Sequence, residues 1–155
     1  MKVTLKPVDR HNLDDTLRMS VDAEQNRFVA PNIVSMAQAA VMPEFIPRLA
    51  YDGDTPVGFV LYTLHDSGDD ECWIHRLLVP TALQRKGYGR AIMLAALDEI
   101  HQARPDSQRV YISFIKGNEV ARRLYESLGF VDDHREIEGE TVYQYPISSV
   151  KGTSI

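Results

Sequence analysis

Glycine and basic residues gather in one segment of the chain, directly after an apolar run that ends at Val79. Gly87-Tyr88-Gly89 opens a predicted helix, and the nearby cations are Arg85, Lys86 and Arg90. The first N–H groups of a helix lack partners within the helix and attract anions, and glycine lets a ligand approach the backbone closely. These properties suit a pyrophosphate, and a glycine-rich turn with solvated basic side chains is the alternative. The segment lacks the lysine–serine ending of a P-loop and the longer dinucleotide fingerprint, so ATP and NAD fit poorly.

A tyrosine in a second segment is suited to proton donation. Tyr125 lies on a predicted helix at 119–128, which follows Asn118 and ends before Gly129. A phenol with a reference pKa of ~10 can donate a proton to a departing thiolate, whose thiol has a pKa of ~8.5. Packing at the edge of the helix is the alternative role of this side chain.

The periodicity of the chain indicates the elements that would position both segments. Apolar residues at i, i+3, i+4 and i+7 predict a helix at 88–103, and apolar β-rich runs predict strands at 73–79 and 110–115. A strand–helix–strand order implies a parallel pair with a right-handed crossover, so we expect one mixed α/β sheet. The other expected elements are strands at 3–8, 48–51, 57–63, 130–136 and 141–147, a helix at 12–20 capped by Asn12, and a helix at 36–41 opened by a capping box of Ser35 and Gln38.

Composition limits the classes of protein that the chain can form. Its 155 residues, 44% of them hydrophobic and 25% charged, fit one globular domain. No apolar run approaches the ~20 residues that span a bilayer, and the first residues lack the apolar stretch of a secretory signal. The single cysteine, Cys72, is compatible with a reducing cytoplasm and offers no zinc-ligand spacing. A net charge of −5 argues against nucleic acid and suits a cationic ligand, so we expect a cytoplasmic protein without metal, membrane or nucleic-acid partners.

Two blocks of the sequence resemble the GNAT superfamily of N-acetyltransferases. Gln84-x-x-Gly87-x-Gly89 is similar to the acetyl-CoA signature of that family, and a second block is similar in Asn118, Ala121, Tyr125 and Gly129-Phe130. The resemblance covers nearly the whole chain and implies a GNAT domain at 1–147, followed by a short tail at 148–155. The implied fold is a mixed, twisted α/β sheet of about six to seven strands, with a splayed parallel pair in the middle and about four flanking helices.

The same resemblance implies acetyl-CoA as the cosubstrate and assigns residues to it. The pantetheine arm would pair with the backbone of Leu77, Leu78 and Val79, between the splayed strands. The pyrophosphate would bind the amides from Arg85 to Arg90, and Tyr125 would serve as the general acid. The residues implied for the cosubstrate are Leu77, Leu78, Val79, Gln84, Arg85, Lys86, Gly87, Tyr88, Gly89, Arg90, Asn118, Ala121 and Arg122.

A narrower resemblance concerns the acceptor. Gln25-x-x-Phe28-Val29-Ala30-x-Asn32, Val57-Gly58-Phe59 and Trp73-Ile74-His75-Arg76 are similar to bacterial GNATs described as spermine/spermidine (diamine) acetyltransferases. This resemblance implies a small-molecule amine, with a polyamine first, and direct transfer in a ternary complex. The alternative acceptors are an amino acid, an aminoglycoside or a protein N-terminus, and a CoA-binding sensor without turnover is the alternative of another class. Family members are often dimers, so a homodimer is expected by analogy.

An acceptor amine arrives mostly as ammonium, so the reaction needs a base. His75 lies on the strand before the glycine-rich segment, and its reference pKa of ~6.5 suits a base at neutral pH. Strand alternation places Trp73, His75 and Leu77 on one face unless a bulge intervenes. Glu71 and a water relay are the alternative bases, and a structural histidine is the alternative role of His75.

Acidic residues around this strand predict recognition of a cation. Four of them lie in one turn: Asp66, Asp69, Asp70 and Glu71. Together with Glu24, in the first connection, they would attract a polycation, and a solvated loop is the alternative. Trp73 would shield an alkyl chain or offer a cation–π face, unless it belongs to the core. The residues predicted to bind the acceptor are Glu24, Glu71, Trp73 and His75.

Overall fold

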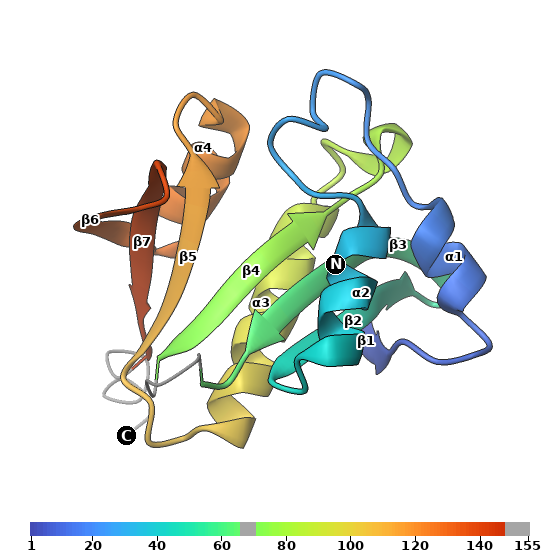
Figure 1. The fold of residues 1–155 in the computed structure, drawn as a ribbon, viewed down its shortest axis with the longest axis horizontal. Coiled ribbons are helices and arrows are strands. Elements are labelled where there is room, and N and C mark those ends of the chain that lie inside the picture. The colour runs from blue at the N-terminus through green and yellow to red at the C-terminus, as the bar shows by residue number, and fades with distance from the viewer. Residues whose placement is uncertain (66–70, 148–155) are drawn as a thin grey trace.

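Alternating apolar residues pair into one mixed sheet, shown in Figure 1 as a twisted surface with helices on both faces. The computed structural model describes residues 1–65 and 71–147, and within them the strand order is β1-β2-β3-β4-β5-β7-β6. The strands are β1 (Thr4–Pro7), β2 (Phe45–Asp52), β3 (Thr55–Thr63), β4 (Cys72–Leu78), β5 (Arg109–Ile115), β6 (Val131–Ile137) and β7 (Glu140–Pro146).

Helices cover the two faces of the sheet in pairs. The helices are α1 (Leu13–Arg18), α2 (Asn32–Val41), α3 (Tyr88–Ala103) and α4 (Glu119–Leu128), and a 3₁₀ turn, η1, spans Thr81–Leu83. In Figure 1, α1 and α2 lie in front of the sheet, and α3 and α4 lie behind it. The expected mixed sheet, with a parallel pair and four flanking helices, is therefore confirmed. No helix in the described part of the chain is long and apolar enough to cross a bilayer.

The stripe of apolar residues predicted for α3 forms the centre of the larger hydrophobic core. Ile92, Met93 and Ile100 are fully buried against the sheet, and each such side chain contributes about 1.5–3 kcal/mol of burial free energy. The helix approaches β3 closely at Gly58, where an added Cβ would lie 2.4 Å from the Cδ1 atom of Ile92. A smaller core on the other face packs β2, β3 and β4 against Met19 and Met36, on the side of α1 and α2.

The parallel pair in the middle of the sheet is joined at one end only. β4 and β5 pair through three positions, Cys72 with Val110, Trp73 with Tyr111 and Ile74 with Ile112. Beyond these positions no further pairing joins the two strands, and Figure 1 shows them separating toward their carboxyl ends. The sheet therefore opens beside the start of α3 and the start of α4.

Two local predictions are wrong for a tertiary reason. The helix α2 begins at Asn32, so Ser35 and Gln38 lie inside it and do not form a capping box. Both side chains instead accept hydrogen bonds from Arg76 on β4. The strand β2 begins at Phe45 and includes Pro47, which is tolerated because the pairing of β1 with β2 ends at Arg48.

Two predicted features lie outside the described residues. Asp66, Asp69 and Asp70 of the predicted acidic turn belong to the segment 66–70. The predicted tail at 148–155 also lies beyond the described part of the chain.

Candidate active site

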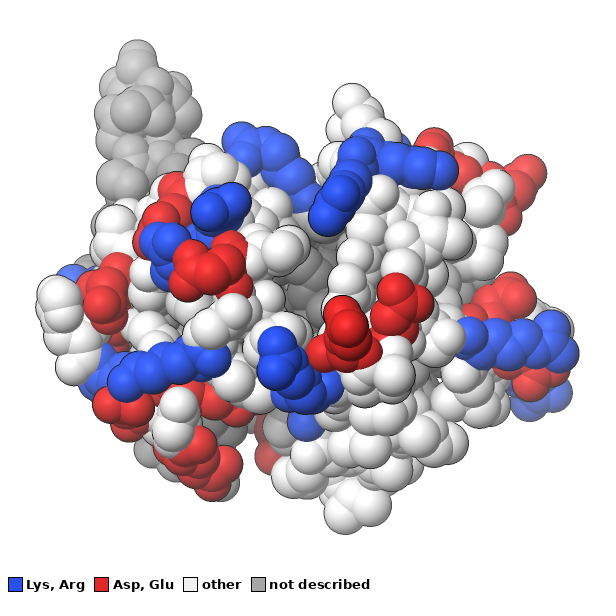
Figure 2. All heavy atoms as spheres, turned by 90° about the horizontal axis from the view of Figure 1, so that it is seen from above, with Lys and Arg blue, Asp and Glu red and all other residues white. Residues whose placement is uncertain are grey.

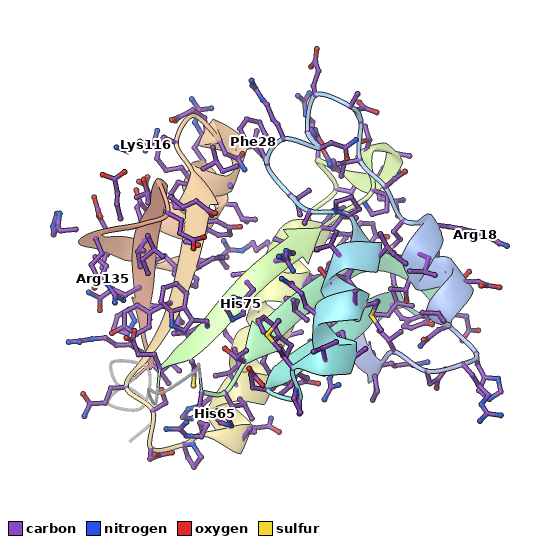
Figure 3. All side chains as sticks on the ribbon, in the orientation of Figure 1. Arg18, Phe28, His65, His75, Lys116 and Arg135 are labelled. Carbon is purple, nitrogen blue, oxygen red and sulfur yellow. The ribbon has the colours of Figure 1, made fainter. Side chains whose placement is uncertain are left out.

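A cleft of about 1020 Å³ enters the sheet where β4 and β5 separate. Seen from above, it lies in a furrow between the side of α4, β5 and β7 and the rest of the molecule (Figure 2). The segment before α2 borders it as well, because residues 24–30 line the cleft together with β4 and β5. Figure 3 shows Phe28 at the open end of the splay and His75 farther down β4.

The start of α3 forms one end of this cleft. Arg85 and Gly87 both adopt a left-handed backbone conformation, with φ of 62° and 91°, and Gly87 is the N-cap residue of the helix. No side chain caps this helix start, which leaves its first N–H groups without a side-chain partner, and Gly87, Gly89 and Arg90 line this end of the cleft. This is the geometry of an anion site.

The side chain of Gln84 holds the connection before α3. Its Nε2 donates to the carbonyl of Val79 at 2.8 Å and to Oε1 of Gln25 at 2.7 Å, and Nε2 of Gln25 donates back to Gln84 at 3.0 Å. The segment before α2 is thereby tied to the glycine-rich connection. Gln84 thus has a positioning role that its place in the sequence signature does not reveal.

The structure separates the residues predicted for the cosubstrate into two groups. Lys86, Tyr88 and Arg122 are not lining residues of the cleft: Tyr88 donates to Asp52 at 2.7 Å, and Arg122 pairs with Glu119 and Glu126 on its own helix. The predicted residues that line the cleft are Leu77, Leu78, Val79, Gln84, Arg85, Gly87, Gly89, Arg90, Asn118 and Ala121.

The helix α4 brings Tyr125 to the cleft. Asn118 caps this helix, since its Oδ1 accepts from the backbone N–H of Ala121 at 3.3 Å, and Gly129 ends it with φ of 107°. Tyr125 is 7% exposed and packs against the rings of Phe114 and Phe130, with centroids 5.6 and 5.8 Å away. Burial raises the pKa of Tyr125 above its ordinary value, so the phenol keeps its proton.

A bulge in β4 sets the direction of His75. In the register with β3, Ile74 pairs with Tyr62 and Arg76 pairs with Leu61, so His75 is an extra residue on β4. Its Nε2 lies 3.1 Å from Oγ1 of Thr63, and its ring lies 4.8 Å from that of Phe45. The half-buried His75 lines the cleft, and the simple alternation expected for this strand is interrupted there.

The structure places Glu71 away from the cleft. The strands separate at their carboxyl ends, and Glu71 precedes the other end of β4, where the strands are paired. Its carboxylate accepts from Arg135 of β6 at 3.2 Å, and Glu71 is not a lining residue. Glu71, predicted as an alternative base and as an acceptor-binding residue, therefore lies outside the cleft.

Trp73 combines the two roles weighed for it. It is 7% exposed, lines the cleft, and stacks on Tyr111 with ring centroids 5.3 Å apart. The guanidinium of Arg135 lies 5.7 Å from its ring centroid and 4.9 Å from that of Tyr111. The guanidinium of Arg135 therefore lies over the aromatic ring that was predicted to offer a cation–π face to the ligand.

Sequence reasoning missed part of the cleft lining. Glu24 lines the cleft as predicted, but so do two further carboxylates, Glu138 and Glu140, from the turn before β7 and its first residue. Arg76 and Ser113 were not singled out as binding residues either. Their position depends on strand register and on the bulge, which composition and periodicity do not show.

The comparisons with known proteins agree with this architecture. The chain matches the model of the family described as "Acetyltransferase (GNAT) family" over residues 18–130. It is 27% identical over 149 residues to the spermine/spermidine N(1)-acetyltransferase of Bacillus subtilis (strain 168), covering 92% of this chain and 97% of the relative.

Solved structures of low sequence identity share the fold. The spermidine N-acetyltransferase from Vibrio cholerae in complex with CoA and spermine has a TM-score of 0.72 at 16% identity, covering 92% of this chain and 93% of that one. An aminoglycoside acetyltransferase in complex with coenzyme A has a TM-score of 0.77 at 17% identity, covering 99% and 100%. With the family match extending over most of the sequence, from before α2 to the end of α4, the chain belongs to the acetyltransferase (GNAT) family of enzymes.

Proposed function

We propose that the protein transfers an acetyl group from acetyl-CoA directly to a primary amine. The observation that carries the proposal is the buried Tyr125, which lines a cleft between splayed strands whose other end is the uncapped start of α3. A module that only binds CoA has no need of a proton donor at this place. Relatives named as N-acetyltransferases and solved with coenzyme A support the same conclusion.

The residues present fit coenzyme A. The backbone of Leu77 and Leu78 pairs with β3 on one side, while its other side faces the splay and pairs with no strand in the described residues. These backbone groups are available to the amides of a pantetheine arm. The start of α3, with Arg85 and Arg90 beside it, suits the pyrophosphate. Acetyl-CoA would supply the activated thioester.

The side chains then divide the proton transfers between them. His75 accepts the proton that the acceptor ammonium loses, and the nitrogen forms a bond to the acetyl carbon. The bond between that carbon and sulfur breaks, and Tyr125 donates its phenolic proton to the sulfur. Its raised pKa keeps this proton available at neutral pH. The nitrogen, now bonded to the acetyl carbon, loses its second proton through solvent to the phenolate of Tyr125, and His75 releases its proton to solvent.

The names of the relatives support a polyamine as acceptor, and the carboxylates of Glu24, Glu138 and Glu140 along the cleft suit a cationic ligand. The predicted acidic turn contributes no support, because Asp66, Asp69 and Asp70 lie outside the described residues and Glu71 pairs with Arg135. A second acceptor class, an amine that also carries an anion, is favoured by Arg76 and is developed below. A cytoplasmic location, inferred from composition, and a homodimer, inferred from family analogy, stay predictions.

The proposal is tested with purified protein, acetyl-CoA and a panel of amines: spermidine, lysine, cadaverine, an aminoglycoside and a peptide with a free N-terminus. We expect free thiol to be released only when an amine is present, and mass spectrometry to find the acetyl group on that amine. Binding of CoA without an acetylated product from any amine would identify a sensor instead.

A further inference from the structure

One wall of the cleft carries a cation that forms no ion pair with an acidic side chain of the described residues. Arg76 is half-buried on β4 and lines the cleft, and it has no ion pair with a described carboxylate. Its two hydrogen bonds, to Oγ of Ser35 and Oε1 of Gln38, are both donated by Nη1 to neutral acceptors of α2. The N–H groups of Nε and Nη2 donate to no described residue, although an arginine remains protonated at neutral pH.

The bulge at His75 places a second donor on the same face of the sheet. Trp73 pairs with Thr63, and Arg76 pairs with Leu61. Thr63 and Leu61 are two positions apart on β3, so they lie on the same face of the sheet. Trp73 and Arg76 therefore share a face although they are separated by an odd number of positions. The Nε1 group of Trp73 is buried without a hydrogen-bond partner among the described residues. A buried N–H of this kind is rarely left unpaired when its ligand is bound.

The facing wall carries a carboxylate. Through the register of β4 with β5 and of β5 with β7, Ser113 and Glu140 lie on the same face of the sheet as Trp73. Oε1 of Glu140 accepts from Oγ of Ser113 at 3.2 Å, and no lysine or arginine of the described residues forms an ion pair with it. Burial lowers the pKa of Arg76, and the charge of Glu140 acts in the opposite direction. The two charges face each other across the cleft without pairing.

We propose that the acceptor carries a carboxylate as well as its amine, and that Arg76 binds this carboxylate. The free Nε and Nη2 groups of an arginine form a fork that matches a carboxylate in two parallel hydrogen bonds. Glu140 attracts the cationic part of the same molecule. A polyamine presents only cations to Arg76, so this arginine favours an amino acid-type acceptor over a polyamine. This inference rests on the proposed acetyl transfer to an amine.

The test compares lysine with cadaverine, which share the same chain and differ by the carboxylate. We expect wild-type kcat/KM to be higher for lysine. Arg76→Gln should lower kcat/KM for lysine by about 10- to 100-fold, the value of a charge-assisted pair of hydrogen bonds, and leave cadaverine nearly unchanged or improved. Arg76→Lys keeps the charge and loses the fork, so its kcat/KM for lysine should lie between the values of the wild type and Arg76→Gln.

Two controls separate this role from the attachment of α2 to the sheet. The melting temperature of each variant reports any structural loss, and a structural loss would lower kcat/KM for both acceptors together. Glu140→Gln should lower kcat/KM for both amines, because it removes attraction for a cation.

A wild-type preference for cadaverine or spermidine over lysine would overturn the proposal without any variant. A lysine-to-cadaverine ratio that Arg76→Gln leaves unchanged would also overturn it. Absence of thiol release with every amine would contradict the acetyl transfer itself.

Discussion

The protonation of Tyr125 is the residue-scale feature on which the proposed chemistry depends. Its phenol is buried between Phe114 and Phe130 and receives no hydrogen bond from a described residue that would favour the phenolate. Burial therefore raises its pKa, and the proton is held until a thiolate forms next to it. A surface tyrosine would lose this proton at lower pH.

Replacing Tyr125 by phenylalanine keeps the ring and removes the proton. We expect turnover to fall by about 10²- to 10⁴-fold, the usual contribution of a general acid, because the thiolate must then leave without a proton. The stabilisation of the protein by CoA should remain. Turnover within a factor of two of wild type, measured where chemistry limits the rate, would mean that water supplies the proton.

The raised pKa of Tyr125 also predicts how stability depends on pH. Below about pH 10 the phenol is neutral in the folded and the unfolded chain, so its ionisation does not change the free energy of unfolding. Above pH 10 the unfolded chain ionises while the folded one does not, so unfolding is favoured by up to about 1.4 kcal/mol per pH unit. Urea unfolding between pH 8 and pH 11 should show a smaller loss of stability for Tyr125→Phe than for wild type. Tyr62, whose pKa burial also raises, is present in both proteins and cancels in this comparison. Equal losses would show that the phenol ionises in the folded state.

At the scale of elements, the start of α3 is the predicted phosphate site. Gly87→Val places a β-branched side chain at a positive φ and beside the first N–H groups of the helix, so we expect the stabilisation by CoA to disappear. Gly53→Val is the matched control, because Gly53 also has a positive φ, with open space around it, in the turn between β2 and β3. Both variants should lose about 1–2 kcal/mol of stability from backbone strain. A CoA-induced shift in melting temperature that survives in Gly87→Val would remove the phosphate from this helix start.

The elements could be predicted where local pattern and tertiary packing agree. The apolar stripe at 88–103 predicts α3 with the bounds that the structure shows, because that stripe is buried in the core. The predicted bounds of α4 also agree with the structure, although only Tyr125 and Leu128 of that helix are buried. The capping box predicted at Ser35 and Gln38 is wrong because both side chains bind Arg76, a residue from a strand far along the chain. The spacing of three residues that suits a cap equally suits one helix face.

The candidate site, too, could be predicted only where a local pattern points to it. The glycine-rich connection and Tyr125 are predicted by local patterns, and both line the cleft. No local pattern predicts that Glu140 and Arg76 lie on facing walls, because this placement depends on the register of β7 with β5 and on the bulge in β4. For the same reason the sequence does not show that Arg135 pairs with Glu71 and covers Trp73.

At the scale of the whole molecule, one opening in the sheet brings the site together. Because β4 and β5 stop pairing after Ile74 and Ile112, the cleft reaches Tyr125 on the side of α4 and Arg76 on the side of α2. The net charge of the chain does not predict the charge of this wall of the cleft. The chain carries −5, yet the wall of the cleft formed by β4 presents an arginine without an acidic partner among the described residues.

The most direct test of acetyl transfer is the rate at which the wild-type protein releases free thiol from acetyl-CoA, measured with and without amines and beside its melting temperature. We predict that acetyl-CoA and CoA both raise the melting temperature, that thiol release requires an amine, and that each thiol released corresponds to one acetylated amine. A protein that is stabilised by CoA but releases no thiol with any amine of the panel would contradict the account and would be a CoA-binding sensor.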